Sequence, residues 1–445
     1  MLCLKVKFAS ARTTMLHDPE HIEAPATNEP IVINDKDRDI LRRLGAEIAA
    51  IGSLPIQKET ARLWSKLNSL ESERPVVWIN ELPWNEMNVD DELTLQCEHQ
   101  FARHLEDDMR KTIYQWQHMR LDTVVSDFIA CPKAIHSTDF GIVEDVEAIK
   151  QDESSAIKSR RFKVQISEPE DIEKIKMPLV THNETATANR FAAMSDIFEG
   201  IIPVKLLGQG HIWFTPWDYL VRWWGIQEAM MDMIMRPEMV HAAVDRMVDA
   251  WMTELDQFEE MNLLELDSTN QRVGSGGYGY VEDSPGEDFQ PDHVRPMDMW
   301  GCSNAQIFSE VSPEMHWDFA IAHDMRWLKR WKMVYYGCCE PLHRKMELLR
   351  KIPNLRKISV SPWCDFEKIF SEIGNDYAIS AKPSPAIFVD GAWNPDNARA
   401  DIRKILDAAG GQGHIELIMK DVSTVNYKPQ RVWQWAQIAM EEVAS

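Results

Sequence analysis

The chain has 445 residues, 44% hydrophobic and 27% charged, which is the composition of a folded globular protein rather than of a disordered or fibrous one. Its formal net charge of −23 makes nucleic acids and anionic membranes unfavourable partners, and no stretch reaches the roughly 20 apolar residues of a membrane span. Seven irregularly spaced cysteines predict a reducing, cytoplasmic setting rather than a disulfide framework.

The first quarter of the sequence is expected to be mainly helical. Residues 1–35 are polar and aperiodic, so we expect a flexible extension there. Helical spacing of apolar residues predicts helices between 37 and 70, and a buried strand follows at 75–79. An acidic amphipathic stretch covers 90–119, so a helical part at about 36–119 precedes the remaining elements.

The middle of the chain combines one strand, one strong helix and a polar segment. Residues 144–161 have no apolar period and predict a surface insertion, whereas 201–207 read as a strand. Pro237 opens a helix whose apolar residues fall on one face.

The last third alternates strands and helices, which indicates parallel strand pairing. The strands are expected at 333–336, 358–360, 377–379 and 415–419, and the helices between them are expected to begin at Ser312, Pro341, Asp365 and near Ile402.

Several segments match, in order and spacing, the pattern of a known enzyme superfamily. They are residues 216–247, residues 309–331, and the strand ends KMVYYGCCEPL, RKISVSPWCD and ISAKPSPAIF. Over roughly residues 120–440 the chain therefore resembles the uroporphyrinogen decarboxylase superfamily. The resemblance implies an α/β fold, a (β/α)8 TIM barrel with an N-terminal helical extension, in which 36–445 form one catalytic domain. Chemistry is then expected at the carboxyl ends of the strands.

One sequence segment distinguishes the branches of that superfamily. The porphyrin-decarboxylating branch carries a basic RQAGR segment, but residues 80–84 of this chain read Asn-Glu-Leu-Pro-Trp. The resemblance thus favours the methyl-transferring branch. It implies a methyltransferase that takes the methyl group of a small methylated donor, such as a methoxylated aromatic (O-demethylation), and passes it to a corrinoid (cobalamin) on a partner protein. A homodimer is a further expectation.

The resemblance also implies zinc as a cofactor, because members of this branch bind it through His-x-Cys and a later Cys. Here Tyr336 stands at the position of the His, Cys338 is retained, and Asp421 lies near the position of the later Cys. Asp421 and Glu310 are the candidate oxygen ligands that would complete a set with Cys338. Alternation along a strand places Cys338, and not Cys339, at the barrel mouth with Tyr336. The alternative is that both cysteines are small buried fillers.

Lys382 and Lys420 each end a predicted strand, and with Tyr336 they are the candidate catalytic residues. A lysine or tyrosine there could protonate or stabilise the oxygen that leaves when an ether is demethylated. The alternative is a structural ion pair, for example between Lys420 and Asp421.

Three of the 17 tryptophans, Trp84, Trp217 and Trp363, are candidate substrate-binding residues, although most tryptophans are expected in the core. Residues 274–280 are glycine-rich but lack a phosphate-binding ending, so we expect a mobile loop over the barrel mouth. His316 and His323 show no metal-ligand spacing and are expected at ordinary core or surface positions.

Two other functions stay open from the sequence. The first is a cofactor-independent decarboxylase or lyase on the same barrel, acting on a carboxylated substrate other than a porphyrinogen. The second is a non-catalytic binding barrel, which the lysines and cysteines at the strand ends disfavour.

Overall fold

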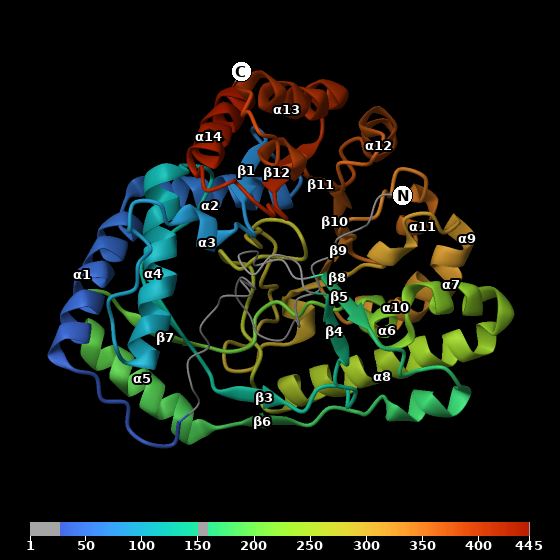
Figure 1. Ribbon diagram of the computed structural model, residues 1–445, viewed down its shortest axis with the longest axis horizontal. Helices are drawn as coiled ribbons and strands as arrows, with labels where there is room; N and C mark the ends of the chain where they lie inside the picture. The colour runs from blue at the N-terminus through green and yellow to red at the C-terminus, as the bar shows by residue number, and fades with distance from the viewer. Residues whose placement is uncertain (1–26, 150–158, 445) are drawn as a thin grey trace.

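A mixed α/β architecture surrounds one parallel sheet. The computed structural model describes residues 27–149 and 159–444. Its central sheet has six strands in the order β1-β12-β11-β10-β9-β8, and all neighbouring pairs are parallel. These strands curve round the middle of the molecule (Figure 1). They are β1 (Val76–Ile79), β8 (Trp300–Ser303), β9 (Met333–Tyr336), β10 (Leu355–Val360), β11 (Ala378–Ala381) and β12 (His414–Met419).

The alternation of strands and helices predicted for the last third is confirmed. Asp365 caps α12 by accepting a hydrogen bond from Lys368 N at 3.0 Å. One prediction is wrong, because Pro341 begins a turn rather than a helix. Lys345 keeps a non-helical backbone there while its ammonium group donates to Phe308 O at 2.6 Å. The helices are α9 (Pro313–His316), α10 (Ala322–Leu328), α11 (Met346–Leu349), α12 (Phe366–Ile373), α13 (Pro395–Ala409) and α14 (Gln430–Val443).

The helix expected from Pro237 is α8 (Pro237–Glu260), which packs against α6 (Pro216–Trp224), α7 (Ile226–Met235) and α10. Its predicted apolar face is confirmed, because every member of that face is buried: Met239, Val240, Ala243, Val244, Met247, Val248, Trp251 and Leu255.

The predicted N-terminal helices are also present. Pro55 starts a new helix after Ser53 ends the first, and the acidic stretch from residue 90 becomes helical only at Gln100. α1 contacts both α4 and α5, and the three helices lie together on one side of the molecule (Figure 1). Their bounds are α1 (Asp35–Gly52), α2 (Pro55–Asn68), α3 (Trp84–Met87), α4 (Gln100–His118) and α5 (Glu184–Phe198).

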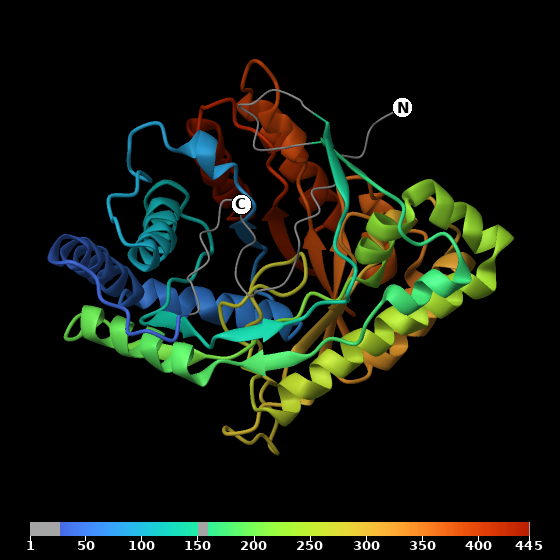
Figure 2. The ribbon, with the colours of Figure 1, turned by 60° about the horizontal axis from the view of Figure 1, so that its bottom comes forward.

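Three two-stranded sheets complete the described strands. β2 (Ile129–Pro132) pairs in parallel with β7 (Val204–Leu207), so the strand expected at 201–207 is shorter than predicted. The antiparallel pair β3–β6 runs between α5 and α8 (Figure 2). The polar segment expected as an insertion at 144–161 begins and ends in the antiparallel pair β4–β5, and 150–158 lie outside the described residues. The remaining bounds are β3 (Ile135–Ser137), β6 (Val180–His182), β4 (Val146–Ile149) and β5 (Ser159–Phe162).

Backbone hydrogen bonds also connect segments outside the six-stranded sheet. Gln209 N donates to Leu263 O at 2.6 Å and Glu265 N donates to Gln209 O at 2.8 Å, which forms a parallel bridge beside β7. Asp122 N donates to Val77 O at 2.9 Å and so joins the segment before β2 to β1.

The glycine-rich segment is not the mobile loop predicted over the mouth. It is buried beside the strands of the central sheet, in the middle of Figure 1. A Cβ atom on Gly274 would lie 2.3 Å from the Tyr335 ring, and one on Gly277 would lie 2.2 Å from the Trp64 ring. Glycine is therefore needed here for close packing and not for mobility.

The flexible extension expected at 1–35 is only partly described, because residues 1–26 lie outside the described residues and α1 begins at Asp35. Within the described part of the chain, no helix is long and apolar enough to cross a membrane.

Candidate active site

Side chains alternate along the strands of the central sheet, and its inner face carries several buried polar residues: Lys357 and Ser359 on β10, Ser380 on β11 and Glu416 on β12. Lys357 on β10 and Glu416 on β12 form a fully buried ion pair of 2.6 Å between Nζ and Oε2. Gly277 N also donates to Glu416 Oε1 at 3.0 Å. Buried charges of this kind are stable only when they are paired, and the glycine-rich segment supplies part of the pairing.

Lys382 follows β11 and is buried beside Tyr335 of β9. Its Nζ donates to the Tyr335 hydroxyl at 2.8 Å, to Ser380 Oγ at 2.5 Å and to Ser380 O at 2.9 Å. Burial lowers the pKa of Lys382 to about 7, and the nearby charge of Lys420 acts in the same direction. Near neutral pH this amine is therefore present in both its protonated and its neutral form.

Lys420 follows β12 and is surrounded by anionic groups. Its Nζ lies 2.9 Å from Asp421 Oδ2, 4.0 Å from Glu81 Oε2 and 3.6 Å from Cys338 Sγ. Burial alone would lower the pKa of Lys420, but the charges of Asp421, Cys338 and Glu81 raise it well above its usual value. Lys420 is thus a fixed cation, whereas Lys382 is a titrating one.

Cys338 faces this cation and contacts its neighbour Cys339. The hydrogen bond from Cys339 is the main cause that lowers the pKa of Cys338, and the charge of Lys420 adds to it. The same hydrogen bond, together with burial, raises the pKa of Cys339. Glu340 holds the turn in place, because its carboxylate accepts hydrogen bonds from Cys338 N at 2.8 Å and Ala305 N at 3.1 Å.

Glu81 and Asp421 follow β1 and β12, and both have a left-handed backbone, with φ of 56°. Arg272 Nη1 lies 2.8 Å from Glu81 Oε1. The side chains of Glu81 and Asp421 are 26% and 44% exposed, so solvent reaches this side of the cluster. Strained backbone of non-glycine residues is common at functional sites.

Several buried donors around the strand ends lack a hydrogen-bond partner among the described residues. They are Asn80 Nδ2, Asn304 Nδ2 and Arg272 Nε. Asn80 and Asn304 are 4% and 1% exposed. Because buried polar groups are nearly always hydrogen-bonded, these donors suit a ligand that offers acceptor atoms.

Lys382, Lys420 and Cys338, which the sequence predicted as site residues, are therefore close together. Tyr336 is not with them, and its prediction at the mouth is wrong. Gly337 has φ of 100° and interrupts the alternation, so Cys338 faces inward while Tyr336 packs outward in the core. The tyrosine of the cluster is Tyr335, which the sequence analysis did not single out.

Tyr336 belongs to a second buried network that the sequence did not reveal. Its hydroxyl lies 2.7 Å from His316 Nε2, and His316 Nδ1 lies 2.9 Å from Lys345 Nζ. Burial lowers the pKa of His316 well below its usual value, and the charge of Lys345 lowers it further. His316 thus takes a hydrogen-bonded core position, in line with the default expectation.

The three candidate tryptophans occupy different environments. Trp217 is only 1% exposed and donates from Nε1 to Phe319 O at 2.8 Å, so it lies in the core, and its role in substrate binding stays a prediction. Trp84 is half-buried against Tyr114, with a centroid distance of 6.1 Å. Trp363 is 71% exposed.

The zinc ligands expected from the resemblance do not form a set. Among residues 27–149 and 159–444, no three His, Cys, Asp or Glu side chains are arranged to hold a metal ion. Glu310 is exposed, and Cys338 faces the ammonium group of Lys420. These donors do not fit zinc, so no chemical step below is assigned to a zinc ion bound by this chain.

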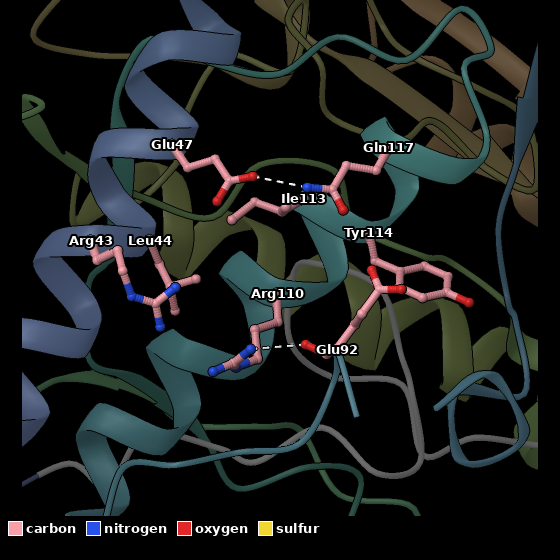
Figure 3. Close-up of a pocket in the computed structure, with 8 residues that line it drawn as sticks. All are labelled: Arg43, Leu44, Glu47, Glu92, Arg110, Ile113, Tyr114 and Gln117. Atoms are coloured by element: carbon pink, nitrogen blue, oxygen red, sulfur yellow. Dashed lines mark hydrogen bonds between the residues drawn. The ribbon is translucent and has the colours of Figure 1, made fainter. Parts of the chain in front are cut away.

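A surface pocket between α1 and α4 has no residue in common with the cluster (Figure 3). A hydrogen bond of 3.0 Å joins Glu47 on α1 to Gln117 on α4 across the pocket, and Arg43 and Arg110 lie below this bond in the view of Figure 3. Most of its polar groups come from surface helices, so we place the candidate active site at the strand ends instead.

Comparison with known proteins adds little evidence for a family or an activity. No family model matches the chain, and no curated protein matches it. Among solved structures, a methyltransferase from Methanosarcina mazei is similar with a TM-score of 0.49 and 8% sequence identity, over 87% of this chain and 99% of that chain. A likeness at this level carries no argument about activity.

Proposed function

We propose that this chain is an enzyme of the methyl-transferring kind, built on a parallel (β/α)8-type barrel formed within residues 36–445. Support for a barrel comes from the curved six-stranded sheet and from the hydrogen bonds that continue it. These bonds run from β7 to Leu263 and from Asp122 back to β1. A ring of parallel strands would place all of the polar strand ends at one mouth.

The proposed reaction is demethylation of a small methylated donor, with a methoxylated aromatic as the first candidate. The methyl group would pass to the cobalt of a corrinoid carried by a partner protein, which supplies the nucleophile. When the methyl–oxygen bond breaks, negative charge develops on the donor oxygen. This oxygen needs a proton or a cation close by.

The observation that carries the proposal is Lys382 beside Tyr335. An amine with a pKa of about 7 is protonated often enough to act as an acid at neutral pH and gives up its proton easily. The Tyr335 hydroxyl, 2.8 Å away, would orient the amine. The charge of Lys420 would stabilise the developing anion, and Asn80 and Asn304 have free N–H groups to hold the donor.

The test is methylation of reduced cobalamin by the purified protein under anaerobic conditions, with methoxylated aromatics and methylamines as donors. We expect methyl transfer from at least one oxygen donor. Lys382→Met should lower kcat by about 100-fold or more, which is the typical contribution of a general acid. Lys345→Met is the matched control, because Lys345 is also buried but bonds to Phe308 and His316 instead. Equal losses in both variants would remove Lys382 from the chemistry.

A lyase is the second candidate, and two cations of the mixed-charge cluster favour it. Arg272 and Lys420, together with the free amide donors, would also bind a carboxylate. This reading predicts release of CO2 from a carboxylated substrate without cobalamin. Such release, with no methyl transfer from any donor, would replace the methyltransferase proposal.

A further inference from the structure

Two neighbouring cysteines lie at the centre of the site, and neither proposed reaction requires both of them. Cys338 Sγ and Cys339 Sγ are 3.6 Å apart, although side chains that are adjacent along a strand point in opposite directions. The strand has already ended at Tyr336, and Gly337 turns the backbone with φ of 100°. The turn therefore brings both sulfur atoms next to each other.

The two thiols are unequal. Cys338 is buried, and its sulfur lies 3.6 Å from Lys420 Nζ, so a positive charge stabilises its thiolate. Cys339 is half-buried and stays protonated, because a second thiolate beside the first would be repelled. One group is thus a nucleophile, and the other is a neighbouring thiol that can react with an oxidised form of it.

The pair lies close to solvent, because Cys339 is only partly buried and the nearby Asp421 is partly exposed. The carboxylate of Asp421 is 44% exposed and lies 2.9 Å from Lys420 Nζ, which in turn contacts Cys338. A molecule the size of hydrogen peroxide needs only a narrow path. Cys364, which follows β10, offers a contrast, because burial raises its pKa and Ser361 is its polar neighbour at 3.7 Å.

We propose that Cys338 and Cys339 are a reversible oxidation site that reacts with hydroperoxides to form a disulfide between adjacent residues. The Cys338 thiolate attacks a peroxide oxygen, the O–O bond breaks, and hydroxide leaves. Cys339 then attacks the sulfur of the resulting sulfenic acid, and the departing hydroxide takes the Cys339 proton as water. Two thiols and one hydrogen peroxide thus give one disulfide and two waters.

This disulfide is reducible under mild conditions. Adjacent Cα atoms are about 3.8 Å apart, whereas disulfides usually join Cα atoms about 4.4–6.8 Å apart. The resulting strain raises the reduction potential, so a dithiol reductant returns both thiols. The oxidised form also removes the negative charge that faces Lys420.

Peptide mapping tests the proposal directly. Residues 333–344 lie between Lys332 and Arg344 and form one tryptic peptide, whose only cysteines are Cys338 and Cys339. After peroxide treatment and alkylation of free thiols, we expect this peptide to lose two hydrogen atoms and to take up no alkylating reagent. Dithiothreitol should restore double alkylation. A peptide that stays doubly alkylated, or that gains oxygen in the wild type without losing hydrogen, would overturn the proposal.

Variants identify the partners. Cys339→Ser should trap a sulfenic acid on Cys338, whereas Cys364→Ser should react like the wild type. Lys420→Met should slow the reaction by up to about tenfold for each unit by which the pKa of Cys338 rises above the assay pH, because the thiolate fraction falls by that factor. An unchanged rate and pH profile in Lys420→Met would exclude the role of Lys420. Because the readout is peptide mass, the outcome is independent of whether methyl transfer is observed.

Discussion

Lys382 connects stability to pH in the direction opposite to that of a lysine whose pKa is raised by an ion pair. Its folded pKa is about 7, well below the ordinary value of 10.5, because burial disfavours the ammonium form. Between pH 7 and pH 10.5 the unfolded chain binds a proton that the folded chain has lost. This contribution to stability therefore increases as the pH rises through that window.

The prediction is that the free energy of unfolding of the wild type rises relative to that of Lys382→Met between pH 7 and pH 10. The relative slope should approach about 1.4 kcal/mol per pH unit, the value for one proton. Urea denaturation at several pH values measures it. Parallel curves for the two proteins would show that Lys382 keeps an ordinary pKa in the folded state.

At the scale of single elements, the paired charges on the inner face of the sheet decide how β10, β11 and β12 fit together. Lys357 and Glu416 are both fully buried and reach across β11 to form their 2.6 Å contact. The pair also binds the backbone of Gly277. A buried pair of this kind adds little net stability, but either partner alone is costly.

We therefore predict that Lys357→Met destabilises the protein by about 3–5 kcal/mol, because an unpaired carboxylate stays buried. Double replacement, Lys357→Met with Glu416→Leu, should cost clearly less than the two single changes combined. Urea denaturation of the three variants provides the comparison. Additive losses would mean that the two residues act separately.

The spacing of apolar residues explains which helices and strands could be predicted from the sequence. Periods of two and 3.6 residues predict strands and helices well, and they located β9, β12 and α8 closely. They could not predict that Gly337 would reverse the facing of the next residue, so Tyr336 was expected where Tyr335 lies. The strand ends pointed to Lys382, Lys420 and Cys338, which the structure brings close together, whereas their role in the chemistry stays a prediction.

Longer-range contacts were beyond the sequence. The glycines at 274–280 were expected to be mobile, since nothing local shows that Trp64 and Tyr335 would pack against them. His316 and Lys345 are separated by most of a βα unit, and only the folded chain brings their side chains together at 2.9 Å. Spacing that predicts secondary structure contains no information about such partners.

At the scale of the whole molecule, Asp122, Arg74 and Val77 form a hydrogen-bonded clasp that joins the segment before β2 to the sheet. Asp122 accepts two hydrogen bonds from the Arg74 guanidinium, at 2.6 and 2.9 Å, and a third from Val77 N at 2.8 Å. Asp122 is buried, and its own backbone bonds to Val77. The clasp thus links β1 with the segment that leads to β2.

Asp122→Asn should lower the free energy of unfolding by about 1.5–3 kcal/mol, which is the value of hydrogen bonds to a charged group. Hydrogen exchange at the Val77 amide should also become faster. Glu73→Gln is the control, because it breaks only an exposed ion pair with Arg62 and should change stability by about 0.5 kcal/mol or less. Equal losses in the free energy of unfolding would show that the hydrogen bonds of Asp122 contribute no more than an exposed ion pair.

The buried position of the glycine-rich segment has a consequence for how the protein is made. This segment is synthesised before β8, but it packs against Tyr335 and bonds to Glu416, which leave the ribosome much later. The interior therefore cannot close until β12 has been translated. We expect nascent chains that stop before residue 414 to remain sensitive to proteases and dependent on chaperones, because their central contacts have no partners yet.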